Sequence, residues 1–343
     1  MKSLLPMSCT TTQSTTQHQR ALRLLSLDGG GVRGLITALW LHRLQAELPG
    51  PLNQHVDLIA GTSTGSLLAC GMAAGHTAQD LVEFYQKHGE AVFPRGASRF
   101  AGRLRKLLSG SRYNHDGLRQ VLDDVVGDTL LSEARTRVMV TCFSPELDQG
   151  IVFDSANPDC ADISMRDACL ASASLPGIFP AYMMTVPGHG RLGLVDGGVL
   201  STDPAPQAVA RLLQTDPPAE DLLLASFGTG IGPAPPARIQ AMQPPDETDD
   251  CAWMAPRLTQ YLGREVTTRE QTMLAGSRYH RFQTRLPAEL AVPDHAGREQ
   301  VKGMLIAAQR FLEHEGGEQK LIALAKAIGV PAPAYSGTGQ ANA

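Results

Sequence analysis

The chain has 343 residues, 43% of them hydrophobic, which is enough to bury a sizeable core in one large domain or in a catalytic domain with a smaller appendage. Thirty basic and 34 acidic residues give a formal net charge of −4, so no overall positive field indicates a nucleic-acid partner. Six cysteines without a C-x-x-C pair argue against a zinc ribbon, a redox motif or a disulfide scaffold.

The predicted elements alternate between strands and helices. Residues 1–20 lack the apolar segment of a secretory signal and are expected to form a disordered tail. Short apolar runs predict strands at 22–27, 56–60, 137–143, 150–154, 192–195 and 222–227. Helical patterns fall at 33–48, 65–74, 77–90, 115–126, 166–174 and 204–214. This alternation is typical of an α/β domain with a largely parallel sheet, which we expect over residues 21–235.

The last third of the chain has a different pattern. A stretch rich in proline and acidic residues follows residue 231 and indicates a loop or linker. Beyond it, helices are predicted at 251–275, 297–314 and 317–329, with a strand within 279–286. We therefore expect residues 236–343 to form a mostly helical extension that serves as a lid, an oligomerisation element or a regulatory sensor.

A glycine-rich loop follows the first predicted strand. From Gly29 to Gly34, "GGGVRG" has the spacing G-x-G-x-x-G, which fits either a dinucleotide pyrophosphate or a loop of backbone donors for an oxyanion. A dinucleotide-binding fold would place an acidic residue at the end of the second strand. Here Asp57 lies at the start of that strand. The oxyanion loop is therefore favoured over a Rossmann-type oxidoreductase.

The second strand is followed by "GTSTG", residues 61–65. Between a strand and a helix, G-x-S-x-G can form a nucleophile elbow, with Gly61 and Gly65 flanking Ser63. The alternative is that Ser63 only caps the next helix. Because both loops leave the carboxyl ends of strands, they are expected to be neighbours. The N–H groups of Gly30 and Gly31 would then face the oxygen that becomes negative when Ser63 attacks a carbonyl.

Asp196 ends a short apolar strand in "LVDGG" and is the candidate base, although the same residues also fit a simple Asp-Gly turn. A Ser-Asp-His triad in the chain order of α/β-hydrolases would use His280 or His295. Neither histidine has a special setting in the sequence, and structural histidines are commoner than catalytic ones. We therefore rank the triad below a direct contact between Ser63 and Asp196.

In this order, "DGGGVRG", "GTSTG" and "DGG" resemble the patatin-like phospholipases, whose pattern is D-G-G-G-x-[RK]-G, G-x-S-x-G and D-G-[GA]. The resemblance covers about residues 22–231. It extends to "ACLASASLPGIFPAYM" and "LLLASFGTG", which are similar to the plant patatins and to the bacterial relatives among which we place the chain. It implies a three-layer α/β sandwich with the activity of a calcium-independent lipid acyl hydrolase, of phospholipase A or lysophospholipase type, that needs no cofactor.

The resemblance also implies the roles of individual residues. Ser63 is the nucleophile and Asp196 is its partner and base, without histidine. The oxyanion loop consists of Gly29, Gly30 and Gly31. Arg33 either organises that loop or attracts an anionic headgroup.

Phospholipids or other acyl lipids are the expected substrates and partners. Bacterial patatin-like proteins include phospholipases activated by cyclic nucleotides and toxins delivered into other cells, so a ligand-activated effector is the alternative function. A basic stretch at 94–112 is suited to an anionic bilayer surface and carries Arg95, Arg99, Arg103, Arg105, Lys106 and Arg112. No run reaches the roughly 18 to 20 apolar residues of a membrane span. We expect a cytoplasmic protein in transient contact with membranes; secretion as an effector, homo-oligomers and a small-molecule activator are left open.

Overall fold

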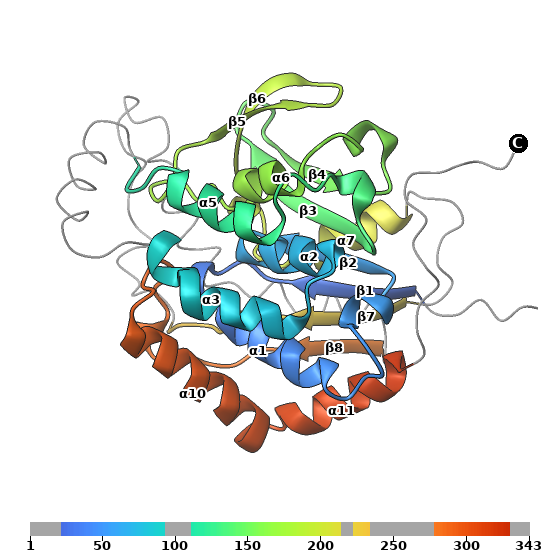
Figure 1. Cartoon of the computed structure of the whole chain (residues 1–343), viewed down its shortest axis with the longest axis vertical. Coiled ribbons are helices and arrows are strands. Elements are labelled where there is room, and N and C mark those ends of the chain that lie inside the picture. The colour runs from blue at the N-terminus through green and yellow to red at the C-terminus, as the bar shows by residue number, and fades with distance from the viewer. Residues whose placement is uncertain (1–21, 93–110, 214–221, 234–277, 330–343) are drawn as a thin grey trace, which may run out of the picture.

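The protein is described here by a computed structural model, which covers residues 22–92, 111–213, 222–233 and 278–329 (Figure 1). These residues form an α/β fold around an eight-stranded sheet with the order β5-β6-β3-β2-β1-β7-β8, and β4 pairs with β3 beside this path. The predicted α/β class is confirmed. The expected tail at 1–20 and the expected helix at 251–275 lie outside the described residues.

The strands form a parallel centre with an antiparallel end. Strands β3, β2, β1, β7 and β8 are parallel neighbours, whereas β4 and β6 run antiparallel to β3, and β5 runs antiparallel to β6. Their bounds are β1 (Leu22–Leu27), β2 (Leu58–Thr62), β3 (Arg137–Ser144), β4 (Gln149–Asp154), β5 (Tyr182–Val186), β6 (Gly190–Asp196), β7 (Leu222–Phe227) and β8 (Tyr279–Phe282). Strand β5 was not predicted; it lies at the sheet edge, and four of its five residues are half-buried or exposed, so its apolar signal is short and weak.

The helices begin and end close to the predicted limits, because each carries a clear apolar pattern between turn residues. They are α1 (Gly34–Gln45), α2 (Thr64–Ala74), α3 (Ala78–Val92), α5 (Asp116–Val125), α6 (Met165–Ser172), α7 (Ala205–Leu213), α10 (Arg298–His314) and α11 (Gly317–Ile328). Helix α2 is buried from Thr64 to Ala73, so it lies inside the domain directly behind the sheet.

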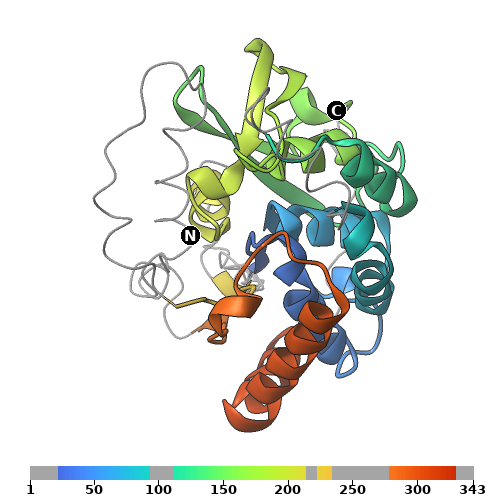
Figure 2. The same ribbon diagram turned by 90° about the vertical axis from the view of Figure 1, so that its left-hand side faces the viewer.

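The alternation of side chains along the strands divides the core into two layers. Leu25 and Leu27 of β1 pack into the large apolar cluster formed with α1, α2 and α6, and Leu24 packs into a smaller cluster with α7. Figure 2 shows α7 (yellow) on the opposite side of the sheet from α3 and α5. The sheet is therefore sandwiched between helices, as expected for three layers.

The segment 278–329 completes the sheet and covers α1. Strand β8 pairs with β7, and helices α10 and α11 pack along α1 at the end of the molecule opposite β5 and β6 (Figure 1). The Trp40 indole of α1 donates a hydrogen bond of 3.1 Å to the Ala308 carbonyl, and its ring lies 4.5 Å from that of Phe311. The division of the chain at residue 235 stays a prediction.

Candidate active site

Ser63 lies on a sharp turn between β2 and α2. Its φ of 53° and ψ of −123° are rare for a residue with a side chain, and such strain is found mainly at functional sites. The flanking glycines permit the turn. A Cβ atom on Gly65 would lie 2.0 Å from the carbonyl oxygen of Leu27, and one on Gly61 would lie 2.3 Å from the carbonyl oxygen of Gly65. The "GTSTG" segment therefore has the geometry of a nucleophile elbow.

Asp196 lies beside Ser63 at the end of β6. Strand β3 brings the two residues together, because it pairs with β2 on one side and with β6 on the other. Both side chains line the same small hollow, and the Gly198 N–H donates a hydrogen bond of 2.7 Å to Asp196 Oδ1. Burial raises the pKa of Asp196 to about 6, and the neighbouring Ser63 hydroxyl and Gly198 N–H only partly oppose this shift.

Two serine residues at and just after the end of α6 hold the backbone of Ser63 and of Asp196. The Ser63 N–H donates to Ser172 Oγ at 2.8 Å, and the Ser172 hydroxyl donates to the Thr141 carbonyl at 2.7 Å. The Asp196 N–H donates to the Ser174 carbonyl at 3.0 Å. These serines belong to none of the three motifs and were not predicted as site residues. The run of small residues "ASAS" was the available signal.

The glycine loop faces the same hollow as Ser63 and Asp196. Gly29, Gly30 and Gly31 line it together with the two side chains. The φ of +61° at Gly31 is a value that favours glycine. The structure thus brings together all five residues that the motifs singled out for the nucleophile, its partner and the oxyanion loop.

Neighbouring segments hold the two ends of this loop. The Gly29 N–H donates to the Thr202 carbonyl and the Val32 N–H donates to the Pro293 carbonyl, both at 2.9 Å. Between them, the N–H groups of Gly30 and Gly31 donate to no backbone oxygen of the described ranges. These are the two donors that an oxyanion in the hollow could use.

Arg33 is buried and holds the loop from inside. Its Nε donates to the Gly30 carbonyl at 3.1 Å, and its Nη1 donates to the Gly230 carbonyl at 2.8 Å. Burial lowers the pKa of Arg33 to about 10, which leaves the guanidinium charged at neutral pH. Of the two expected roles, these contacts fit the organisation of the loop. A side chain that is 4% exposed is poorly placed to attract a headgroup.

An apolar pocket of about 720 Å³, its open mouth included, extends from Ser63 between four helices. Near Ser63 it is bounded by Gly31, Leu175 and Pro293, which also border the hollow of Asp196. The remaining walls come from α2, α3, α5 and α6 and their flanks, and include Leu67, Phe84, Tyr85, His88, Val92, Leu118, Val121, Leu122, Cys169, Ala173, Ile178 and Phe179. The lining is almost wholly apolar, so the pocket is suited to a hydrocarbon chain.

The histidines considered for a triad have no hydrogen bond to the site. His280 is half-buried in β8 and His295 follows Asp294, and within the described ranges neither ring bonds to Ser63 or Asp196. The contacts that shift the pKa of Asp196 come from Ser63 and Gly198.

Two further expectations concern membranes and metals. The predicted membrane-binding stretch lies outside the described residues as far as residue 110, while Arg112 forms an ion pair with Asp294. None of the helices that the structure describes has the length and apolar character needed to cross a bilayer. Over the same ranges, no three His, Cys, Asp or Glu side chains are grouped as a metal site would require.

A serine on a strand–helix elbow, next to a buried carboxylate and a glycine loop, is an arrangement typical of serine hydrolases. The family model "Patatin-like phospholipase" matches residues 25–209, more than half of the chain, and the chain belongs to this family. It is 28% identical over 255 residues to Patatin-like protein 3 of Arabidopsis thaliana, with 62% of this chain and 60% of the relative covered. It is 31% identical over 255 residues to Patatin-15 of Solanum tuberosum, with 64% of each covered.

The chain spans less than two thirds of the length of these plant relatives. The bacterial origin expected from the sequence stays a prediction. Among solved structures, VipD from Legionella pneumophila aligns with a TM-score of 0.41 at 11% identity, covering 84% of this chain and 67% of that one. Human GIVD cytosolic phospholipase A2 aligns with a TM-score of 0.41 at 12% identity, covering 90% and 60%. Likenesses this loose carry no conclusion about the site.

Proposed function

We propose that the protein is a lipid acyl hydrolase that cleaves fatty-acyl esters of phospholipids or lysophospholipids. One observation carries the proposal: Ser63 shares a hollow with the buried carboxylate of Asp196 and also lines a large apolar pocket. A serine so placed can attack an ester whose acyl chain fills the pocket. Membership of the patatin-like phospholipase family supports the same reaction.

In the first half of the reaction, Ser63 Oγ attacks the ester carbonyl carbon while its proton passes to the Asp196 carboxylate. The carbonyl oxygen becomes negative and is stabilised by the N–H groups of Gly30 and Gly31. When the tetrahedral intermediate collapses, the alcohol of the lysolipid or glycerol moiety leaves with the proton from Asp196. The acyl group remains on Ser63.

In the second half, a water molecule attacks the acyl-enzyme and gives its proton to Asp196. Collapse releases the fatty acid and returns the proton to Ser63 Oγ. A carboxylate with a pKa of about 6 is a stronger base than a solvated one and is still mostly ionised at pH 7. An ester also has a better leaving group than an amide, so a direct Ser–Asp pair is adequate without a histidine.

A fluorophosphonate probe should label Ser63 and no other residue, because the probe requires an activated serine nucleophile. Intact-mass and peptide mass spectrometry would locate the adduct. The same preparation should release fatty acid from mixed phospholipid micelles, and Ser63→Ala should abolish both labelling and release. Both should persist in excess EDTA, because no step uses a metal ion. Labelling or hydrolysis that survives in Ser63→Ala would place the nucleophile elsewhere.

Enlarging Val92 should shift the preference toward shorter acyl chains. Val92 ends α3, lines the pocket and is only half-buried, so a phenylalanine there can extend into the pocket without overpacking the core. We expect Val92→Phe to lower kcat/KM for long-chain esters roughly tenfold or more, the scale on which a pocket discriminates lost methylene contacts. Short-chain esters should be hydrolysed at the wild-type rate.

The matched control is Ile306→Phe, a similar enlargement on the exposed face of α10 outside the pocket. It should leave the chain-length profile unchanged. If Val92→Phe lowered kcat/KM equally for short-chain and long-chain esters, the pocket would not be the site that holds the acyl chain.

A further inference from the structure

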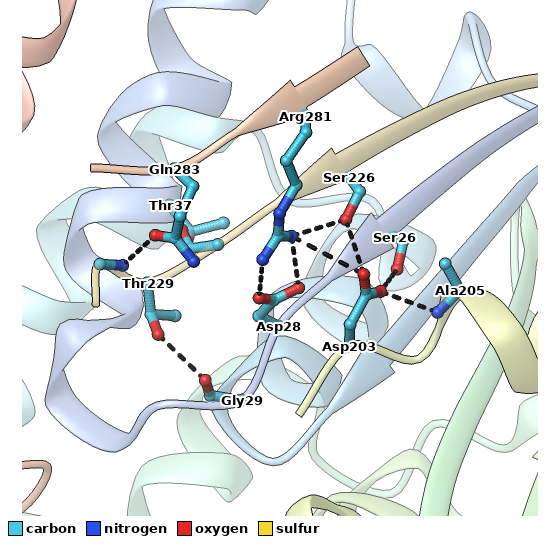
Figure 3. Close-up of polar contacts among 12 residues, drawn as sticks. Ser26, Asp28, Gly29, Thr37, Asp203, Ala205, Ser226, Thr229, Arg281 and Gln283 are labelled. Carbon is cyan, nitrogen blue, oxygen red and sulfur yellow. Dashed lines mark hydrogen bonds and ion pairs between the residues drawn. The ribbon is translucent and has the colours of Figure 1, made fainter. Parts of the chain in front are cut away.

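An Arg-centred network lies directly behind the glycine loop, outside the residues to which the reaction has been assigned (Figure 3). Arg281 of β8 donates two hydrogen bonds to Asp28, from Nη1 to Oδ1 at 2.9 Å and from Nη2 to Oδ2 at 2.6 Å. Its Nη1 also lies 3.8 Å from Asp203 Oδ2 and donates to Ser226 Oγ at 2.6 Å. The Asp28 and Asp203 side chains are 4% and 5% exposed, so the ion pairs are shielded from water.

The two carboxylates flank the hydrogen bond that joins the two halves of the site. Asp28 immediately precedes Gly29 of the glycine loop, and Asp203 immediately follows Thr202 in the segment that leaves Asp196. The Gly29 N–H and the Thr202 carbonyl are bonded to each other at 2.9 Å. Arg281 therefore contacts Asp28 and Asp203, the two residues that flank this Gly29–Thr202 hydrogen bond.

Asp203 is itself fixed in place by its other partners. Its Oδ1 accepts from the Ser26 hydroxyl at 2.8 Å and from the Ala205 N–H at the start of α7 at 2.9 Å, and its Oδ2 accepts from Ser226 Oγ at 3.2 Å (Figure 3). Without a cation between them, Asp28 and Asp203 would be two buried carboxylates that repel each other. If this repulsion moved Asp28 and Asp203 apart, Gly29 would be pulled away from Thr202.

The two residues that follow Arg281 bind the segment after β7, which in turn contacts the glycine loop. The Phe282 carbonyl accepts from Gly228 N–H at 2.8 Å, and Gln283 Oε1 accepts from Gly230 N–H at 2.7 Å. Between these two glycines, the Thr229 hydroxyl donates to the Gly29 carbonyl at 3.0 Å (Figure 3). Strand β8 and the residue after it therefore act on the glycine loop by two routes. One is the bond from Arg281 to Asp28, and the other is the segment 228–230 at the end of β7.

We propose that Arg281 is a positioning residue for catalysis, which fixes the oxyanion loop relative to the Asp196 segment by binding Asp28 and Asp203 together. The proposal rests on the proposed hydrolysis. A residue from the C-terminal part of the chain then supports the active site. Arginine is required because its planar fork binds a carboxylate through two parallel hydrogen bonds, which lysine cannot do.

The test compares Arg281→Lys and Arg281→Met with wild type. Because a misplaced oxyanion donor affects the chemical step, kcat should fall roughly tenfold in Arg281→Lys and on the order of 10²-fold in Arg281→Met, with KM within about twofold. Active sites should be counted by fluorophosphonate titration, so that kcat refers to folded enzyme. If Arg281→Met fails to fold, Arg281→Lys decides the matter alone.

The chain offers a closely matched control in Arg137→Lys. Arg137 also binds a buried carboxylate at two points, donating from Nε at 3.0 Å and from Nη2 at 2.6 Å to Asp154, and its side chain is 16% exposed against 15% for Arg281. It lies at the start of β3, the end of the sheet away from Ser63. Arg137→Lys should lower the melting temperature about as much as Arg281→Lys while kcat per active site stays at the wild-type value.

Hydrogen exchange provides a readout that does not depend on activity. The amides of Gly29 and Val32 are hydrogen-bonded, and their exchange should become faster in Arg281→Lys but not in Arg137→Lys. Wild-type kcat and exchange in Arg281→Lys, or an equal loss of kcat in Arg137→Lys, would overturn the proposal. If the wild-type protein shows no lipid hydrolysis that Ser63→Ala abolishes, the proposed function is rejected. The hydrogen-exchange comparison would still decide whether Arg281 positions the loop.

Discussion

Replacing Asp196 by asparagine should lower phospholipid hydrolysis on the order of 10³-fold or more, nearly as far as Ser63→Ala. Asparagine keeps the shape of the side chain and can still accept the 2.7 Å hydrogen bond from the Gly198 N–H. It cannot take the Ser63 proton. The measurement is kcat for Asp196→Asn, Ser63→Ala and wild type on one phospholipid, with fatty-acid release followed by mass spectrometry.

The histidine alternative is tested in the same experiment. His280→Ala and His295→Ala should each stay close to wild type, and a loss of several orders of magnitude in either would establish a triad. In wild type, kcat/KM should rise with pH through about 6 and then level off, because the base must be ionised and the pKa of Asp196 is about 6.

The stability of Asp196→Asn serves as a check on its fold. The pKa of Asp196 in the folded protein is raised above the ordinary value of 3.8, so ionisation of this buried carboxyl lowers the free energy of unfolding as pH rises through about 6. At pH 8 the neutral asparagine removes that cost. We therefore expect a melting temperature equal to or above that of wild type, alongside the loss of activity. A low melting temperature would attribute the loss to misfolding.

Gly30→Ala should lower kcat by about 10²-fold or more, the scale of losing one oxyanion donor. A Cβ atom at this position would lie 2.1 Å from Thr229 Oγ1 and 2.7 Å from Thr229 Cβ, so the loop or its neighbour must move. The φ of 166° at Gly30 is extended backbone that alanine can adopt, and the expected effect comes from this contact. The measurement is kcat and KM on the same phospholipid, referred to titrated active sites.

A double variant tests the cause of this loss. Thr229→Gly removes the side-chain atoms that the new methyl group would meet, at the cost of the hydrogen bond from Thr229 to the Gly29 carbonyl. Gly30→Ala combined with Thr229→Gly should therefore be faster than Gly30→Ala alone. A Gly30→Ala variant that turns over like wild type would remove the loop from the mechanism, and a double variant no faster than the single one would reject the contact as the cause.

Much of the fold could be predicted because the signals are local. Residues 22–27 form a strand with the predicted limits, since four of the six residues are leucines and the run stops at the turn residues Asp28 and Gly29. Strand β5 carries no such signal, because an edge strand is partly exposed and needs only the pairing with β6 to form. The predicted strand at 279–286 ends at Phe282, where pairing with β7 stops.

Around the candidate site, the supporting residues could not be predicted. Ser172 and Arg281 lie 109 and 253 residues from their partners Ser63 and Asp28, and neither belongs to a motif. Their side chains acquire a function only through what the sheet places beside them. The two expected roles of Arg33 were likewise indistinguishable from sequence, because the difference between them is the burial of its guanidinium.

By itself, the sequence determined the α/β class and predicted the elbow at Ser63, the glycine loop and Asp196 as candidate site residues, because each signal depends on a few adjacent residues at the end of a strand. Only the tertiary structure decided which N–H groups stay unbonded in that loop, which helices enclose the apolar pocket, and that β8 supplies Arg281 behind the site. The physical reason is that burial and hydrogen-bond partners depend on segments far apart in the chain, whereas strand, turn and helix patterns depend on neighbours.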